Sequence, residues 1–177
     1  VSTGQVSPHG VLAVTFTNKA AKEMVARLTA MLPMNSGYSA RGMWIGTFHG
    51  LCNRLLRAHH REAALPAQFQ ILDSADQLSA IKRLLKNLNV DDEKYPPREL
   101  ASFINAHKEQ GLRAAHAEAY DDYTRRRVAL YAEYEAQCQR EGVVDFADLL
   151  LRTYELLTRN EPLRRHYQER FRHILVD

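Results

Sequence analysis

A ring, a hydroxyl, an amide and an ammonium group follow one another at Phe16, Thr17, Asn18 and Lys19. Hydroxyl, amide and ammonium groups can hold phosphate oxygens without reading a base sequence. A phenylalanine at the end of a strand can stack on a nucleobase, which contributes about 1–3 kcal/mol per base. A phenylalanine at this spacing can equally be a core residue that closes the strand. These residue types therefore indicate a candidate nucleic-acid site and leave the role of Phe16 open.

The four residues lie between a predicted strand and a predicted helix. Val11 to Phe16 is a short apolar run with β-branched residues, as is typical of a buried strand. Apolar residues then recur at helical spacing to about Leu32, and Thr17 or Asn18 can cap that helix. Ligands of open α/β sheets bind at the carboxyl ends of strands, where a helix N-terminus also favours phosphate. Loops are expected at Val1–Gly10 and Pro33–Gly42.

The segment Gly46–His49 repeats this arrangement. Met43 to Ile45 is predicted to be a second buried strand, and a helix is predicted from Thr47 to about Arg57. Thr47 can cap this helix, and Phe48 lies on its apolar face, so Phe48 is expected to be buried. His49 could be a general base, a metal ligand or a DNA contact, although no second histidine with an acidic partner follows at metal-ligand spacing. Two such turns on a parallel sheet would line one groove.

Positive charge is concentrated near these turns. The net charge of the chain is +3, yet residues 1–60 carry six lysines and arginines against one acid, Glu23. This excess favours a partner that bears phosphate groups. A solvated surface of chance sign remains the alternative.

The middle of the chain is predicted to be helical. Between Arg61 and Gly142 no strand signal is stronger than Phe69–Leu72, which indicates an all-helical lobe inserted into an α/β domain. Tyr120, Tyr123, Tyr131 and Tyr134 are interpreted as lobe core rather than a base-stacking platform. Val144-Asp145 is expected to open the next helix, with Asp145 as its cap. The last residues, from His173 onward, are strand-like and end in Asp177.

Four motifs in this order resemble the UvrD/Rep-like superfamily 1 DNA helicases: Thr15-Phe-Thr-Asn-Lys-Ala-Ala-Lys-Glu-Met24, Gly46-Thr-Phe-His49, Val144-Asp-Phe-Ala-Asp-Leu-Leu150 and Ile174-Leu-Val-Asp177. The resemblance covers nearly the whole chain. It implies a partial RecA-like parallel sheet, with residues 1–64 and 143–177 in the motor domain and residues 65–142 as the inserted helical subdomain. It also implies that a groove for single-stranded DNA is lined by Phe16, Thr17, Asn18, Lys19, Thr47, Phe48 and His49.

The same resemblance implies the activity of a parent protein. That protein would be an ATP-dependent 3′-to-5′ DNA helicase of repair or replication, with ATP and Mg²⁺ as cofactors. Asp177 would hold Mg²⁺ through water. The expected partners are single-stranded DNA, duplex–single-strand junctions and the parent's second motor domain. Two residues depart from the family pattern, because Gly50 replaces a usual serine and Ala147 replaces a frequent aspartate.

No phosphate loop of the form G-x-x-x-x-G-K-[ST] occurs in the 177 residues, and the glutamate expected after Asp177 is not among them. The chain is therefore expected to be an internal segment without catalytic residues of its own, inactive when isolated. Two alternatives stay open: the helicase subunit of a recombination helicase–nuclease, and a non-enzymatic DNA-binding helical module.

Cys52 and Cys138 are interpreted as reduced core cysteines. Reduced cysteines and the lack of an apolar run of membrane-spanning length predict a cytoplasmic location.

Overall fold

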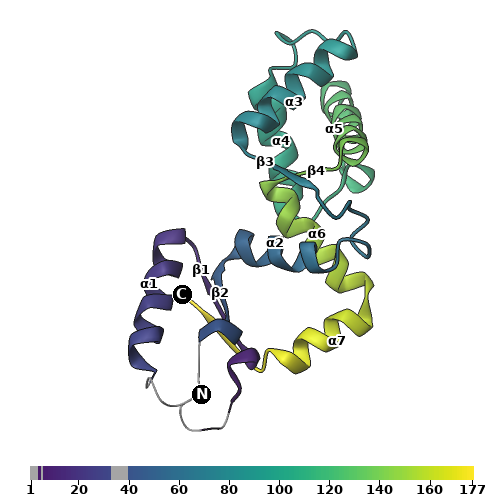
Figure 1. The fold of residues 1–177 in the computed structure, drawn as a ribbon. Coiled ribbons are helices and arrows are strands. Elements are labelled where there is room, and N and C mark those ends of the chain that lie inside the picture. The colour runs from purple at the N-terminus through teal and green to yellow at the C-terminus, as the bar shows by residue number, and fades with distance from the viewer. Residues whose placement is uncertain (1–3, 5, 33–39) are drawn as a thin grey trace. The chain divides into compact units, whose positions relative to one another are not determined.

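The computed structural model of the protein describes residue 4, residues 6–32 and residues 40–177. Two compact units make up the chain (Figure 1). The first unit comprises Val1–Ala58 together with Tyr154–Asp177, and the second comprises His59–Thr153. The first is built on a parallel sheet and the second is mainly helical, which confirms the α/β class.

A three-stranded parallel sheet forms the base of the first unit. Its strands are β1 (Val11–Thr15), β2 (Trp44–Thr47) and β5 (His173–Val176), in the order β2-β1-β5. β1 ends one residue before the predicted end. β2 extends to Thr47, beyond the predicted end at Ile45. Because all three strands run in one direction, their carboxyl ends meet at one edge, which is called the carboxyl edge below.

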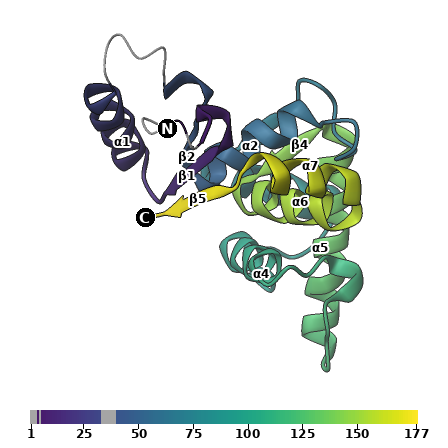
Figure 2. The ribbon, with the colours of Figure 1, turned by 90° about the horizontal axis from the view of Figure 1, so that it is seen from below.

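The first unit also contains helices α1 (Asn18–Met31), α2 (Phe48–Ala58) and α7 (Glu161–Arg170), the end of α6 (Phe146–Arg159), and the short 3₁₀ turns η1 (Pro8–Gly10) and η2 (Ala40–Gly42) (Figure 2). The predicted loop Pro33–Gly42 lies outside the described residues except for η2, and the start of the predicted loop Val1–Gly10 lies outside them as well. Trp44 anchors the core, because its ring packs on Tyr167 and Phe171 at centroid distances of 5.7 and 5.2 Å.

The second unit contains α3 (Ser74–Asn87), α4 (Pro97–Glu109), α5 (Asp122–Glu141), the 3₁₀ turn η3 (Ala114–His116) and the first part of α6 (Phe146–Arg159). It also holds a short parallel strand pair, β3 (Gln70–Leu72) with β4 (Val143–Asp145). The lobe is therefore not all-helical. Val144 and Asp145 lie in β4, and the helix predicted to open at these residues begins directly after them, at Phe146. Gly142 ends α5 with a φ of 66°, and its carbonyl accepts a hydrogen bond from the Gln70 N–H, which turns the chain into the ladder with β3.

The core of the second unit lies between its helices. Tyr131 and Tyr134 of α5 are fully buried, which confirms the prediction that they belong to the lobe core. Tyr120 and Tyr123 are exposed, so for these two residues that prediction is wrong. The Tyr123 ring stacks on Tyr95, a buried residue of that core, with the centroids 5.1 Å apart.

A buried charged cluster joins several elements of the second unit. The Lys108 ammonium lies 2.8 Å from Asp145 and 3.4 Å from Asp148, and all three side chains are almost completely buried. Arg113 and Arg152 reach Asp148 at 2.6 and 2.7 Å. Burial by itself would raise the pKa of Asp148, but Lys108, Arg113 and Arg152 together hold that pKa far below its usual range. Because Asp148 and Arg152 belong to this cluster, it includes the first part of α6, which lies in the second unit.

Asp145 has a role in addition to this ion pair. Its carboxylate accepts hydrogen bonds from the Asp148 N–H at 2.8 Å and from the Tyr134 hydroxyl at 2.7 Å. The first bond caps α6, which confirms the predicted capping role. Among the described residues, no helix is long and apolar enough to cross a membrane.

Candidate nucleic-acid interface

The carboxyl edge brings together three residues that are far apart in the sequence. Thr15 and Thr47 are partners in the β1–β2 register, and Val14 and Val176 are partners in the β1–β5 register. The three residues that directly follow these strand ends are Phe16 after Thr15, Phe48 after Thr47 and Asp177 after Val176. The parallel pairing therefore gathers the ends of the predicted motifs at one edge of one sheet.

The first turn is held by its own threonines. The Thr15 hydroxyl, which is buried, donates to the Thr17 carbonyl at 3.2 Å. The Thr17 hydroxyl oxygen accepts from the Ala20 N–H at 3.1 Å and caps α1, as predicted. A threonine hydroxyl that accepts one hydrogen bond keeps its own O–H donor. Thr17 can therefore cap the helix and still donate to a phosphate oxygen.

The amino end of α1 is electropositive. Asn18 and Lys19 are exposed, and the first turn of the helix contains no acid. Unpaired N–H groups and the helix dipole favour an anion at such an end, and Lys19 adds a full positive charge.

The second turn repeats the first in its hydrogen bonding. The Thr47 hydroxyl oxygen accepts from the Gly50 N–H at 3.1 Å, which confirms the predicted cap of α2. A Cβ at Gly50 would lie 3.1 Å from that same hydroxyl oxygen, so glycine allows the turn to close tightly over the cap. The first turn of α2 contains no acid, and His49 is exposed there.

Two phenylalanine rings face one another across the two turns. The centroids of Phe16 and Phe48 are 5.4 Å apart, with the ring planes at 52°. Phe16 is 75% exposed and Phe48 is 37% exposed. The prediction that Phe48 is buried is therefore wrong. Phe48 is the first residue of α2 and stands at the carboxyl edge, whereas the buried face of this helix is formed further along, at Leu55 and Leu56.

Asp177 follows β5 at the same edge. Its N–H donates to the Val14 carbonyl at 3.0 Å, so the backbone continues beside β1, while the residue is exposed. Within residues 4, 6–32 and 40–177, no group of three His, Cys, Asp or Glu side chains could hold a metal ion. Asp177 is thus a single carboxylate at the end of a parallel strand.

Several features of this unit do not follow from the sequence pattern. The pairing of the two exposed rings depends on the strand register, although the pattern indicates each phenylalanine singly. The Arg54 guanidinium lies over the Trp44 ring, 4.3 Å from its centroid. An aromatic residue at each of two adjacent strand ends is the signal that could have indicated the ring pair.

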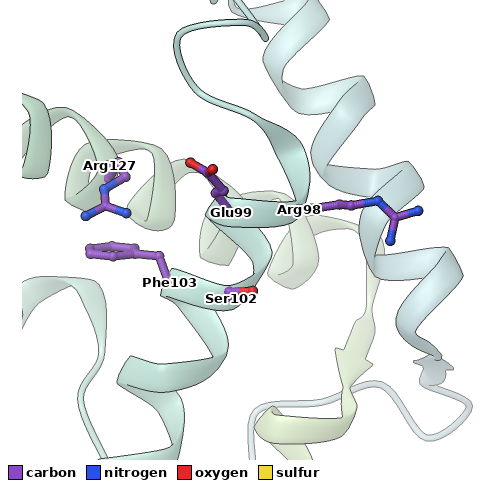
Figure 3. Close-up of a pocket in the computed structure, with 5 residues that line it drawn as sticks. All are labelled: Arg98, Glu99, Ser102, Phe103 and Arg127. Carbon is purple, nitrogen blue, oxygen red and sulfur yellow. The ribbon is translucent and has the colours of Figure 1, made fainter.

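The second unit has a surface hollow of about 450 Å³, lined by Arg98, Glu99, Ser102, Phe103 and Arg127 (Figure 3). The Arg127 guanidinium lies 4.4 Å from the Phe103 ring centroid and 4.9 Å from that of Tyr123. It therefore covers a ring face that a base would need for stacking. Because the lining also carries charges of both signs, this hollow is a weaker candidate for a nucleic-acid site than the carboxyl edge.

Comparison with known proteins places the chain in a family. Residues 1–177 match the model of the UvrD/REP helicase N-terminal domain. Over 178 residues the chain is 48% identical to DNA helicase II of Escherichia coli, covering all of this chain and 24% of that protein. Over 174 residues it is 38% identical to ATP-dependent DNA helicase PcrA of Staphylococcus aureus, covering 97% of this chain and 23% of that protein.

A probable DNA helicase II homolog of Rickettsia felis is 39% identical over 176 residues, which cover 97% of this chain and 26% of that protein. The chain spans about a quarter of the length of these curated relatives. The family match extends over every one of the four motifs. The chain belongs to the UvrD/REP helicase family and corresponds to the N-terminal domain of that family.

Proposed function

We propose that the whole protein is an ATP-dependent DNA helicase and that the carboxyl edge of the first unit holds single-stranded DNA. The observation that carries this proposal is the exposed ring pair of Phe16 and Phe48, which lies between two capped helix amino ends without acids. Further support comes from the relatives, which are named as DNA helicases.

Each part of the edge has a separate task in this proposal. The exposed face of Phe16 stacks on a base, and Phe48 supports the ring from the other side. The phosphate backbone of the DNA is contacted by polar groups of both turns, together with the N–H groups that begin α1 and α2. These polar groups are Asn18, Lys19, His49 and the Thr17 and Thr47 hydroxyls. Stacking and phosphate contacts are both independent of base identity, so the strand can move through the site.

ATP and Mg²⁺ are the proposed cofactors, and Asp177 is the one residue of this chain assigned to them. A carboxylate oxygen suits Mg²⁺, which takes one or two carboxylates, keeps several waters and binds substrate phosphates. Bound Mg²⁺ neutralises charge that develops on the phosphates during hydrolysis. An exposed carboxylate just beyond β5 fits this water-mediated role, and no further ligand is assigned within this chain.

We infer that the whole protein couples ATP-driven closure of two motor domains to 3′-to-5′ steps along one strand. The first unit contributes part of the first motor domain, and the second unit is the inserted helical subdomain. Junctions of duplex and single-stranded DNA are the proposed substrates. The strand slips less at each step because Phe16 holds a base while the phosphate contacts change.

The test is Phe16→Ala in the full-length protein. Basal ATP turnover should survive, whereas the number of base pairs unwound per ATP should fall, because the strand slips without the stack. Met31→Ala is the matched control: it removes an exposed apolar side chain from the far end of α1, about 20 Å from the amino end. Equal unwinding per ATP by the wild type and Phe16→Ala would refute the assignment.

A further inference from the structure

A basic hollow lies at the opposite edge of the sheet of the first unit. Its volume is about 350 Å³, and its lining residues come from two segments: Val6, Ser7, His9 and Gly10 before β1, and Arg170, Arg172 and His173 around the start of β5. These segments lie side by side where the strands begin (Figure 1). A strand of five residues spans about 15 Å, so the hollow is separate from the carboxyl edge.

The charge of this basic hollow has one sign. Its lining contains two arginines and two histidines and no acid. Within the part of the chain that the structure describes, neither arginine forms an ion pair. The Arg170 Nε donates to the His9 carbonyl at 3.0 Å, and the Arg172 Nε donates to the Glu169 carbonyl at 3.4 Å. Each guanidinium is thus anchored through Nε and keeps its terminal N–H groups for another partner.

The wall of the basic hollow is closely packed. A Cβ at Gly10 would lie 3.1 Å from the Arg170 carbonyl oxygen, so the two segments can approach this closely because residue 10 is glycine. The Arg170 guanidinium also lies over the rings of Trp44 and Phe171, at 5.1 and 4.9 Å. These contacts fix Arg170 before any ligand arrives, which lowers the entropy cost of binding.

We propose that the basic hollow binds phosphate groups, either of a nucleic-acid backbone or of a free polyphosphate. Guanidinium forks match phosphate oxygens bidentately. A volume of about 350 Å³ leaves room for a phosphate with part of its hydration shell. Two arginines without an acid exceed what one carboxylate needs, so phosphate is favoured over an acidic side chain.

Arginine labelling with phenylglyoxal, followed by peptide mass spectrometry of the full-length protein, tests this site directly. Pyrophosphate or an oligothymidylate should slow the labelling of Arg172 several-fold, also in the Phe16→Ala variant. Arg165 is the internal control, because it pairs with Glu161 at 2.6 Å on α7 and does not line the basic hollow. Protection by the oligonucleotide alone identifies a nucleic-acid backbone as the source, and protection by pyrophosphate alone identifies free polyphosphate.

The nucleic-acid source has a second readout. The affinity for single-stranded DNA falls as salt rises, so a plot of log affinity against log salt has a negative slope. Arg172→Gln should make this slope shallower by about 0.7 for each phosphate group that the variant no longer neutralises. Arg165→Gln, with the same change of charge, should leave the slope unchanged. The proposal would be overturned if neither pyrophosphate nor the oligothymidylate slowed the labelling of Arg172. It would also be overturned if polyglutamate slowed this labelling as much as the phosphate probes do. Neither outcome depends on Phe16, so failure here differs from failure of the helicase assignment.

Discussion

Phe48 should act on DNA binding through Phe16, because the two rings form a pair 5.4 Å apart. With Phe16 75% exposed, its ring depends on this neighbour for its orientation. An aromatic pair contributes about 0.5–1.5 kcal/mol beyond area burial. Since 1.4 kcal/mol corresponds to a tenfold change, loss of the pair should weaken DNA binding by about two- to tenfold.

Substitutions at both positions separate this effect from folding stability. Phe48→Leu removes the ring and keeps most of the apolar volume, so the melting temperature should change little. Truncation of a buried phenylalanine to alanine lowers the free energy of unfolding by about 3–5 kcal/mol. Phe48→Ala should lower it by less, because Phe48 is 37% exposed. Phe16→Ala should keep the melting temperature and lose about 1–3 kcal/mol of base stacking, which is about a 5- to 150-fold loss of affinity.

The assay is fluorescence anisotropy of a labelled oligothymidylate with the full-length protein, at one salt concentration and without nucleotide. In a Phe16→Ala background, Phe48→Leu should have no further effect. If it weakens binding by the same factor in both backgrounds, Phe48 contacts DNA independently of Phe16. If Phe48→Leu binds as tightly as the wild type, the ring pair has no part in binding.

Further predictions concern the charged cluster, a thiol and the metal residue. Asp148→Asn should lower the free energy of unfolding by about 3–5 kcal/mol in urea titrations, since it removes a buried negative charge that lies beside Lys108, Arg113 and Arg152. Folding lowers the pKa of Asp148, so the ionised carboxylate should stabilise the folded protein fully at pH values above the ordinary pKa of 3.8. This contribution should be lost as the pH falls below 3.8, which acid titration followed by circular dichroism can measure. Burial raises the pKa of Cys138 to about 11, so a thiol reagent at pH 8 should modify it only after unfolding. Asp177→Ala in the full-length protein should abolish ATP hydrolysis measured by phosphate release, and normal turnover would exclude this carboxylate as the Mg²⁺ residue.

Local features were predicted well because they depend on neighbouring residues. The apolar run at Val11 and the helical spacing beyond Asn18 specify a strand and a helix within one short segment. Thr17 and Thr47 cap helices three residues or fewer away, so their hydrogen bonds follow from chain order. The four motifs likewise identified the family, and the match over residues 1–177 confirmed it.

Tertiary structure decided which of these segments meet. β5 pairs with β1 across most of the chain length, and this pairing brings Asp177 beside the first turn. Phe48 has an apolar helical position, yet its exposure depends on which elements cover the carboxyl edge, and the spacing of residues carries no information about that cover. The pairing of β3 with β4 escaped prediction because each strand is three residues long, too short for a periodic signal.

The charged cluster and the basic hollow depend on packing alone. The sequence of α4 does not distinguish Lys108 from an exposed helical lysine, and its burial depends on the elements that carry Asp145 and Asp148. Arg170 and His9 are 161 residues apart and meet because parallel strands begin at the same edge. The sequence thus determined the strand-to-helix turns and the family. Long-range pairing determined which side chains face one another, because contact between distant segments depends on the whole fold.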